Sequence, residues 1–237
     1  MPSKRFFCVW LPLIASAAYL LGMAALPEPP KCISTLVLSE LGVIEIGTAV
    51  LFLLAAIMGA VLFIRSRRIA PTRYRAVYII LVLGGLFIAG EETNYGQFIY
   101  DFHTGEWFTK QPPVEFNLHK LYGHKPARRL NTVATFGFPV VCIVLPIMGG
   151  RYRWYRRGRW GYFLLPGKEL IAVTAMAQLL TWLDDIYLAF TSDFNAWARA
   201  SEFKELYWGY IVLMYSLILL RRLKADFKAA ECGEPPH

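Results

Sequence analysis

Charged residues are scarce in this 237-residue chain: they make up 18% of it, whereas hydrophobic residues make up 56%. So few charges exclude an ordinary soluble domain of this size, which needs a more polar surface. Cysteine is scarce as well, and Cys8, Cys32, Cys142 and Cys232 show no CxxC or other metal-ligand spacing. We therefore expect neither a disulfide framework nor a zinc knuckle.

The sequence signatures of several common enzyme classes are also absent. The chain contains no GxSxG, HExxH, GxxxxGK[ST] or dinucleotide-binding fingerprint, which leaves serine hydrolases, zincins, nucleotide hydrolases and Rossmann enzymes without support. The net charge of +8 does not indicate a nucleic-acid partner, because Lys and Arg stand in short runs between apolar segments, where they orient membrane helices. Membrane lipids are the expected partners, with anionic headgroups docking around residues 151–160.

Long apolar runs are what the chain has in abundance. Runs of roughly 20 residues are long enough to cross a bilayer as helices. They predict transmembrane helices at residues 6–26, 41–64, 76–97, 130–148, 169–190 and 206–220, the last beginning nearer Glu202. The first run resembles a secretory signal, but its length and the proline-rich residues 26–30 favour a retained helix. Residues 1–237 are therefore predicted to form a single all-α domain, a polytopic membrane helix bundle of about six transmembrane helices.

The distribution of basic residues predicts the orientation of this bundle. Alternating loops and both termini place 17 of the 25 Lys and Arg residues on one side and 8 on the other. Because positive residues accumulate on the cytoplasmic side, we expect both termini to be cytoplasmic. The long loop 101–129 then faces outward. In the second predicted helix, Ala55, Ala56, Gly59 and Ala60 are small enough to let another helix approach closely.

Several polar residues lie inside or beside the predicted spans. Ionisable residues are costly in the bilayer and usually face a bundle interior or an aqueous cavity. They are Glu45 in the second helix, Glu91, Glu92, Asn94 and Gln97 in the third, and Gln178, Asp184 and Asp185 in the fifth, with Glu40, Glu202 and Glu205 just above them. At 1.5 Å of rise per residue, the carboxylates of the three helices reach one level in the outward part of the membrane.

Helical spacing suggests which way these residues face. Thr174, Gln178, Thr181 and Asp185 form one stripe of the fifth helix. Glu91, Asn94 and Tyr95 form a patch on the third, and two polar stripes are most easily satisfied by facing each other. Each of these residues alone also fits a structural role, because acidic side chains reach toward headgroups and amides join helices. Taken together, the set favours a functional polar pocket.

A motif at the end of the third helix resembles a known family. Residues 90–97 read GEETNYGQ, Thr104 and Trp107-Phe108 follow, and residues 115–119 read EFNLH. This is similar to uncharacterised bacterial multi-pass membrane proteins with GEE-x-S-W-G-Q and E-x-N-L-H-N motifs, and residues 40–45, ELGVIE, resemble the E-x-G-x-x-E of that family. The resemblance covers roughly a third of the chain. It departs at Asn94-Tyr95, at Lys120 and at Pro112-Pro113, and it implies a bacterial inner (cytoplasmic) membrane location without implying a reaction.

The chemistry of these residues predicts two kinds of site. Glu91, Glu92, His119 and Asp185 are the predicted catalytic residues, with a carboxylate as general acid or base. Glu91, Glu92, Glu115 and His119 offer oxygen and nitrogen ligands for a divalent metal. Glu40, Glu45, Asn94, Gln97, Asn117, Gln178 and Asp184 complete the polar site.

Three functions are compatible with such a site. The first is a membrane enzyme, a hydrolase or transferase acting on a lipid or lipid-linked substrate. The second is an accessory or assembly subunit of a larger membrane complex, which would bring other membrane subunits as partners. The third, a cation- or proton-linked transporter, fits less well because the inner halves of the helices are almost wholly apolar.

Overall fold

The computed structural model describes residues 6–25, 42–68, 72–93, 124–151, 160–190 and 200–231. Within these ranges the regular structure is entirely helical. The order is η1 (Phe6–Trp10), α1 (Leu11–Ala25), α3 (Val43–Arg65), η2 (Ser66–Arg68), α4 (Thr72–Glu92), α7 (His124–Pro139), η4 (Val140–Val144), α8 (Leu145–Arg151), α9 (Trp160–Leu164), η5 (Lys168–Leu170), α10 (Ile171–Phe190) and α11 (Ala200–Glu231). The predicted all-α class is confirmed.

Four helical segments are long and apolar enough to cross a membrane. They are Val43–Arg65, Tyr74–Glu92, Thr132–Gly149 and Phe203–Phe227, which makes the chain a helical membrane protein. The first and fifth predicted spans are also helical, as η1 with α1 and as α10. Their crossing of the bilayer stays a prediction, since the apolar part of the first, Phe6–Ala18, is shorter.

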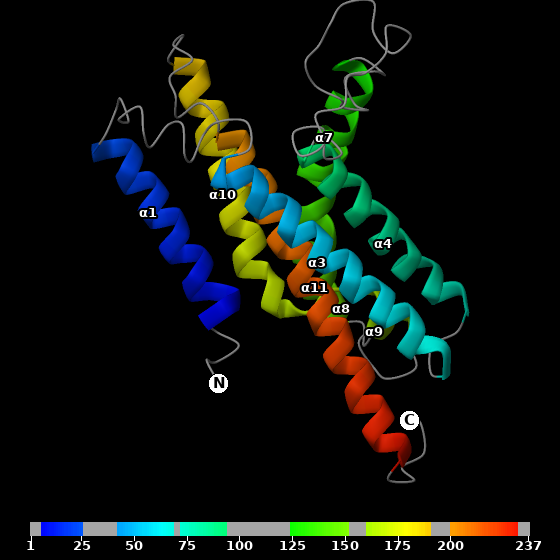
Figure 1. Ribbon diagram of the computed structural model, residues 1–237. Helices are drawn as coiled ribbons and strands as arrows, with labels where there is room; N and C mark the ends of the chain where they lie inside the picture. The colour runs from blue at the N-terminus through cyan, green and yellow to red at the C-terminus, as the bar shows by residue number, and fades with distance from the viewer. Residues whose placement is uncertain are drawn as a thin grey trace, which may run out of the picture.

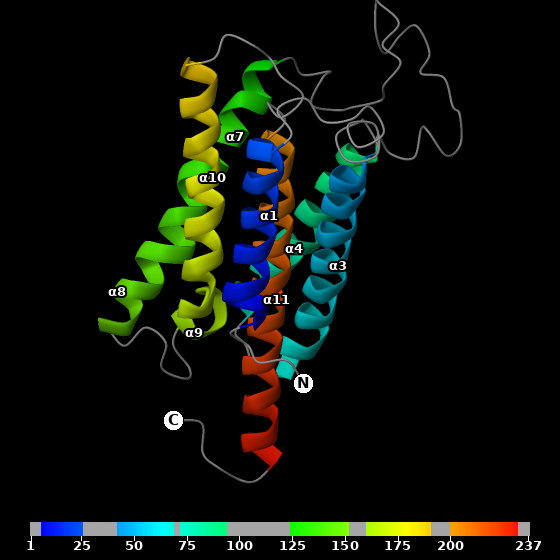
Figure 2. The same ribbon diagram turned by 90° about the vertical axis from the view of Figure 1, so that its left-hand side faces the viewer.

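The helices stand side by side in one bundle (Figures 1 and 2). α3 packs against α4 on one side and α11 on another, α11 packs against α10, and α1 and α7 contact α10. α1 begins at the same end of the bundle at which α11 finishes, and α11 projects past the other helices there (Figure 1). We call this end the basic end. Its exposed basic residues within the described ranges are Arg65, Arg67, Lys168, Arg221 and Lys224.

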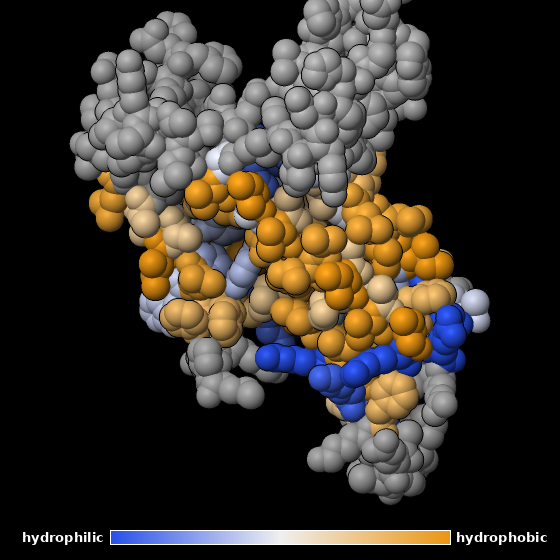
Figure 3. Space-filling view, in the orientation of Figure 1, coloured by the Kyte–Doolittle hydropathy of each residue, from blue (hydrophilic) through white to orange (hydrophobic). Residues whose placement is uncertain are grey.

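The opposite end of the bundle is called the acidic end, because α3 begins and α4 finishes there with Glu45, Glu91 and Glu92. Between the two ends the surface is apolar, with large side chains such as Ile80 and Leu83 exposed by 66% and 62%. Figure 3 shows this surface as an orange belt with a blue band along its lower edge. Exposed apolar side chains over the middle of a bundle match the hydrocarbon of a bilayer.

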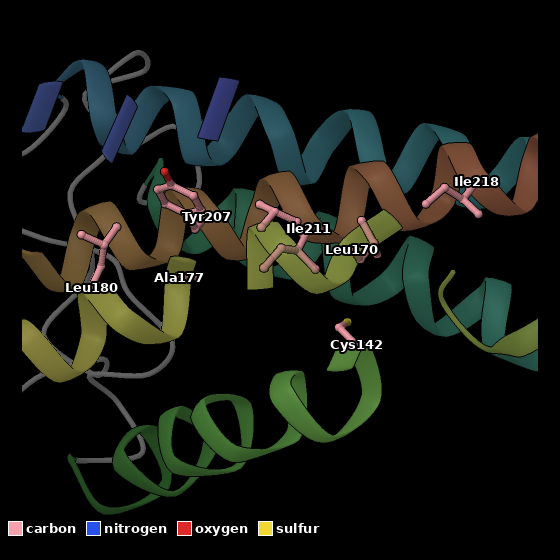
Figure 4. Packing of buried hydrophobic residues seen from close by; sticks show 8 residues of the cluster. Cys142, Leu170, Ala177, Leu180, Tyr207, Ile211 and Ile218 are labelled. Atoms are coloured by element: carbon pink, nitrogen blue, oxygen red, sulfur yellow. The ribbon is translucent and has the colours of Figure 1, made fainter. Parts of the chain in front are cut away.

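The buried core between α10 and α11 is built mainly of aliphatic side chains (Figure 4). Leu170 of η5 and Val173, Ala177 and Leu180 of α10 meet Tyr207, Ile211 and Ile218 of α11, with Cys142 of η4 beside them. Because lipid tails are as apolar as these residues, close packing is what holds such helices together. Tyr207 also donates a hydrogen bond to the Pro12 carbonyl at 2.6 Å and lies 2.5 Å from the Ser16 hydroxyl, which ties α1 to α11.

A second cluster closes the basic end. Leu62, Tyr74, Tyr78, Phe163, Leu219 and Leu223 are buried together there, and the Tyr74 and Phe163 rings stack at 5.6 Å. The cluster joins α3, α4 and α11 around the short helix α9. A five-residue helix has few internal bonds, so α9 depends on these contacts for its position.

Side chains from neighbouring helices satisfy the last carbonyls of α9 and of the turn after it. Arg222 donates from Nη1 to the carbonyl oxygens of Tyr162 at 3.0 Å and Leu165 at 2.7 Å. Tyr78 donates to the Phe163 carbonyl at 3.2 Å, and Tyr215 donates to that of Leu164. The final carbonyls of a helix have no partner within the helix and carry partial negative charge, so a cation and two hydroxyl donors stabilise them.

Candidate functional site

The structure describes only part of the predicted site. The side chains of Glu45, Glu91, Glu92 and Gln178 are described. Asp184 and Asp185 lie in α10, but their side chains, and all of Glu40, Asn94, Gln97, Glu115, Asn117, His119 and residues 101–123 of the predicted loop, are outside the described residues. The last part of that loop, residues 124–129, is instead the start of α7. The ends of α3, α4 and α10 that carry the predicted carboxylates do lie at the same end of the bundle (Figures 1 and 2).

Small residues bring α3 and α4 into very close contact. A Cβ atom on Gly85 would lie 2.7 Å from the Phe52 carbonyl oxygen and 3.0 Å from the Ala56 Cβ. Likewise, a Cβ on Gly59 would lie 3.2 Å from the Tyr78 carbonyl oxygen. The predicted close approach is confirmed at Ala56 and Gly59, which contact α4; Ala55 is also buried, and Ala60 is only partly buried. The partner helix is α4, and the contact sets the register between the two helices.

This register places Glu45 and Glu92 on facing stripes of α3 and α4. Glu92 follows Gly85 by seven residues on α4, and Glu45 precedes Ala56, which Gly85 contacts, by eleven residues on α3. Seven and eleven residues are two and three helical turns, and each returns to the same face within about 20°. The helices are antiparallel, so these steps run roughly 10 Å and roughly 16 Å toward the acidic end. Both side chains are partly buried. The two carboxylates thus lie on facing stripes of tightly packed helices, with Glu45 about one helical turn nearer the acidic end.

Glu91 lies on a different side of α4. It follows Gly84 by seven residues, and a Cβ on Gly84 would meet no atom within 4 Å. Glu91 therefore lies on the side of α4 that Gly84 faces, whereas Glu92 lies on the side that packs against α3, and both side chains are partly buried. Because Glu91 and Glu92 are separated by about 100° around α4, the two side chains have different surroundings. Glu92 is the one that completes the pair with Glu45.

The polar stripe of α10 meets η4 at Thr174. Thr174 and Thr181 are buried, and the Thr174 hydroxyl lies beside the Cys142 thiol of η4. Thr181 instead donates to the Ala177 carbonyl of its own helix at 3.0 Å. At Thr174, then, the stripe faces η4 and not α4, in contrast to the expectation that the stripes of the third and fifth spans face each other. The Thr181 hydroxyl thus has a structural partner, whereas the buried Thr174 oxygen forms no hydrogen bond within the described residues.

Lys204 of α11 is a buried cation that the sequence analysis did not single out. It is only 7% exposed, and its Nζ lies 5.0 Å from the centre of the Trp208 ring. That ring stacks on Phe138 of α7 at 5.6 Å. The four-residue spacing between Lys204 and Trp208 is the signal that could have revealed the pair, since such residues are neighbours on a helix.

Lys204 does not belong to the Glu45–Glu92 pair. A Cβ on Gly47 would contact Leu206 at 3.1 Å, which aligns α3 with α11 at this level. Glu45 precedes Gly47 by two residues, and Lys204 precedes Leu206 by two. Two residues turn a helix by about 200°, so both side chains leave from the far sides of their helices. The acidic end therefore holds the carboxylate pair and the lysine on separate faces.

No group of three or more His, Cys, Asp or Glu side chains that could hold a metal occurs within the described ranges. The predicted metal set cannot be assembled there, because Glu115 and His119 lie outside them. Glu45 and Glu92 together offer carboxylate oxygens for a proton relay or for part of an ion's coordination shell.

No family model, curated protein or solved structure matches this chain. The resemblance of the GEE and ENLH motifs to a bacterial family stays a prediction.

Proposed function

We propose that this protein is a membrane enzyme, a hydrolase or transferase that acts on a lipid or lipid-linked substrate at the acidic end of its bundle. The observation that carries the proposal is the placement of Glu45 and Glu92 on facing stripes of α3 and α4. Like charges on facing stripes of packed helices disfavour each other, and a proton or cationic group that interacts with both lowers their energy. Such a pair is suited to proton transfer.

In this proposal the two carboxylates divide the acid and base roles. One takes a proton from a water or hydroxyl nucleophile, and the other donates a proton to the leaving oxygen. Glu91, His119 and Asp185 complete the proposed site, and their oxygen and nitrogen atoms are suited to a divalent metal. The open side of α4 next to Gly84 provides a route by which the polar part of a lipid reaches the site from the bilayer.

The closed basic end favours an enzyme over a transporter. Transport needs a path to both sides of the membrane, whereas Leu62, Tyr78 and Phe163 are packed together at the basic end. The hydrogen bonds of Arg222 and Tyr78 to α9 further hold that end shut. We place the basic end, with both termini, in the cytoplasm of a bacterium and the acidic end outside, with six spans in the inner membrane.

Mass spectrometry of lipids tests this proposal. The purified protein is incubated with vesicles of phosphatidylethanolamine, phosphatidylglycerol and a polyprenyl phosphate, and the lipids are compared before and after. The wild-type protein is expected to produce a new lipid species. Glu92→Gln is expected to lower its rate about a hundredfold or more, the usual loss when a general acid or base is removed.

Glu169→Gln is the matched control, because Glu169 is an exposed carboxylate at the basic end. It has the same change of charge and is expected to keep the wild-type rate. Equal loss in both variants, or a Glu92→Gln variant that is folded and fully active, would contradict the assignment. Stable co-purification of another membrane protein, with no lipid product from the isolated chain, would instead indicate an accessory subunit.

A further inference from the structure

Two arginines converge on one aromatic ring where α3 ends and α4 begins. Phe63 lies in the last turn of α3, Arg67 in η2 and Arg75 in the first turn of α4. The central guanidinium carbon of Arg67 lies 5.5 Å from the centre of the Phe63 ring, and that of Arg75 lies 4.6 Å from it. Each contact is a cation–π interaction, and the two guanidinium carbons are therefore at most about 10 Å apart.

The charges of this pair are not balanced by carboxylates in the described part of the chain. Residues 46–90 contain no Asp or Glu at all. Neither arginine forms an ion pair among the described residues, and the buried Nε of Arg75 has no hydrogen-bond partner there. Two like charges on one ring repel each other, and an anion close to both would offset that repulsion.

The position of Arg75 adds an independent reason to expect an anion. The N-terminus of a helix carries partial positive charge, which disfavours a cation and favours an anion. Arg75 is in the first turn of α4, and that turn contains no acidic residue. The helix N-terminus and the Arg75 side chain therefore both present positive charge at the first turn of α4. Acidic residues are the usual residues in the first turn of a helix.

The geometry points to a phosphate-binding site formed by Arg67 and Arg75 on Phe63, and we infer that it holds the headgroup phosphate of an anionic membrane lipid. The site lies where two membrane-spanning segments, Val43–Arg65 and Tyr74–Glu92, reach the same surface. Figure 3 shows the blue band at this edge of the apolar belt. A lipid phosphate sits at that boundary, with its acyl chains along the belt. Guanidinium groups match phosphate oxygens in geometry as well as charge.

Native mass spectrometry in detergent micelles tests the inference, with phosphatidylglycerol as the probe and phosphatidylcholine for comparison. The wild-type protein is expected to retain phosphatidylglycerol more tightly than phosphatidylcholine. Arg67→Gln with Arg75→Gln is expected to weaken phosphatidylglycerol binding about tenfold, because two charge-assisted contacts are lost. Phe63→Leu keeps both charges but removes the ring, and it is expected to weaken binding by a smaller factor.

The control is Arg65→Gln with Arg221→Gln, which removes two exposed arginines from the same end. This control changes the net charge by the same amount as the Arg67 and Arg75 double variant. Its phosphatidylglycerol binding is expected to weaken by less than threefold. An equal loss in the two double variants would overturn the inference, since binding would then follow overall charge. Displacement of the lipid by inorganic phosphate would also overturn the lipid assignment and indicate a soluble phosphate ligand. The Arg67→Gln single variant, at an exposed turn, tests the site if the double variant does not fold.

Discussion

The two ends of the bundle treat their polar groups in opposite ways. At the basic end, Arg222, Tyr78 and Tyr215 donate hydrogen bonds to the carbonyls of α9 and the turn after it, and an aromatic cluster fills the space between the helices. At the acidic end, Glu45 and Glu92 lie on facing stripes of α3 and α4, although they have the same charge. The first arrangement stabilises the fold, whereas the second gathers carboxylates on facing helices, as functional sites often do.

The largest effect on stability is expected from Arg222 at the basic end. Arg222→Ala removes two hydrogen bonds from a charged donor and exposes the Tyr162 and Leu165 carbonyls to an environment with few other donors. We expect a loss of about 3 kcal/mol or more in the free energy of unfolding. Denaturant unfolding in detergent measures it. The neighbouring Arg221→Ala, at an exposed position, is the control, and an equal loss there would mean that the hydrogen bonds to α9 are unimportant.

A smaller effect is expected between the two ends, where α3 and α4 touch. Gly85→Ala forces a Cβ to within 2.7 Å of the Phe52 carbonyl, and we expect it to lower stability by about 1–3 kcal/mol. Gly84→Ala enters open space and is expected to leave stability unchanged or to raise it, because Ala favours helix. Thermal unfolding of the two variants compares them directly. If Gly84→Ala is the more damaging, the register assigned to α4 is wrong.

The smallest of these effects is expected from one hydroxyl of the basic end. Tyr78→Phe removes the bond to the Phe163 carbonyl at 3.2 Å while keeping the ring in its cluster. We expect a loss of about 1 kcal/mol, the usual net value for one neutral hydrogen bond. Unfolding curves for this variant are compared with Thr72→Ala, a hydroxyl removed from an exposed position of the same helix. If Tyr78→Phe lowers the free energy of unfolding no more than Thr72→Ala does, the Tyr78 hydroxyl does not stabilise α9.

Much of the fold could be predicted from apolar runs. The second span was predicted at 41–64 and is α3, Val43–Arg65, and the fifth was predicted at 169–190 and ends with α10 at Phe190. α4 begins four residues earlier than predicted, and α11 extends to Glu231. Hydropathy marks the part of a helix that lies in lipid, whereas hydrogen bonding continues beyond it.

The site could be predicted less completely. Sequence spacing identified Glu45, Glu91 and Glu92 and showed that the two adjacent glutamates differ in direction. It could not show which of them meets Glu45, because that depends on the contact of Gly85 with Phe52 between two helices. Lys204 was missed for a related reason: its burial depends on Trp208 and on Phe138 of α7. Registers between helices come from packing, which one sequence does not display.

Cross-linking of cysteine pairs tests the central claim, that Glu45 and Glu92 face each other, most directly. In a variant without Cys8, Cys32, Cys142 and Cys232, the pair Glu45→Cys and Glu92→Cys is compared with Glu45→Cys and Glu91→Cys, using a short bismaleimide reagent in membranes. Because residues 91 and 92 differ by about 100° around α4, we expect the 45–92 pair to cross-link several-fold faster. A 45–91 pair that cross-links equally fast or faster would show that the two carboxylates do not face each other.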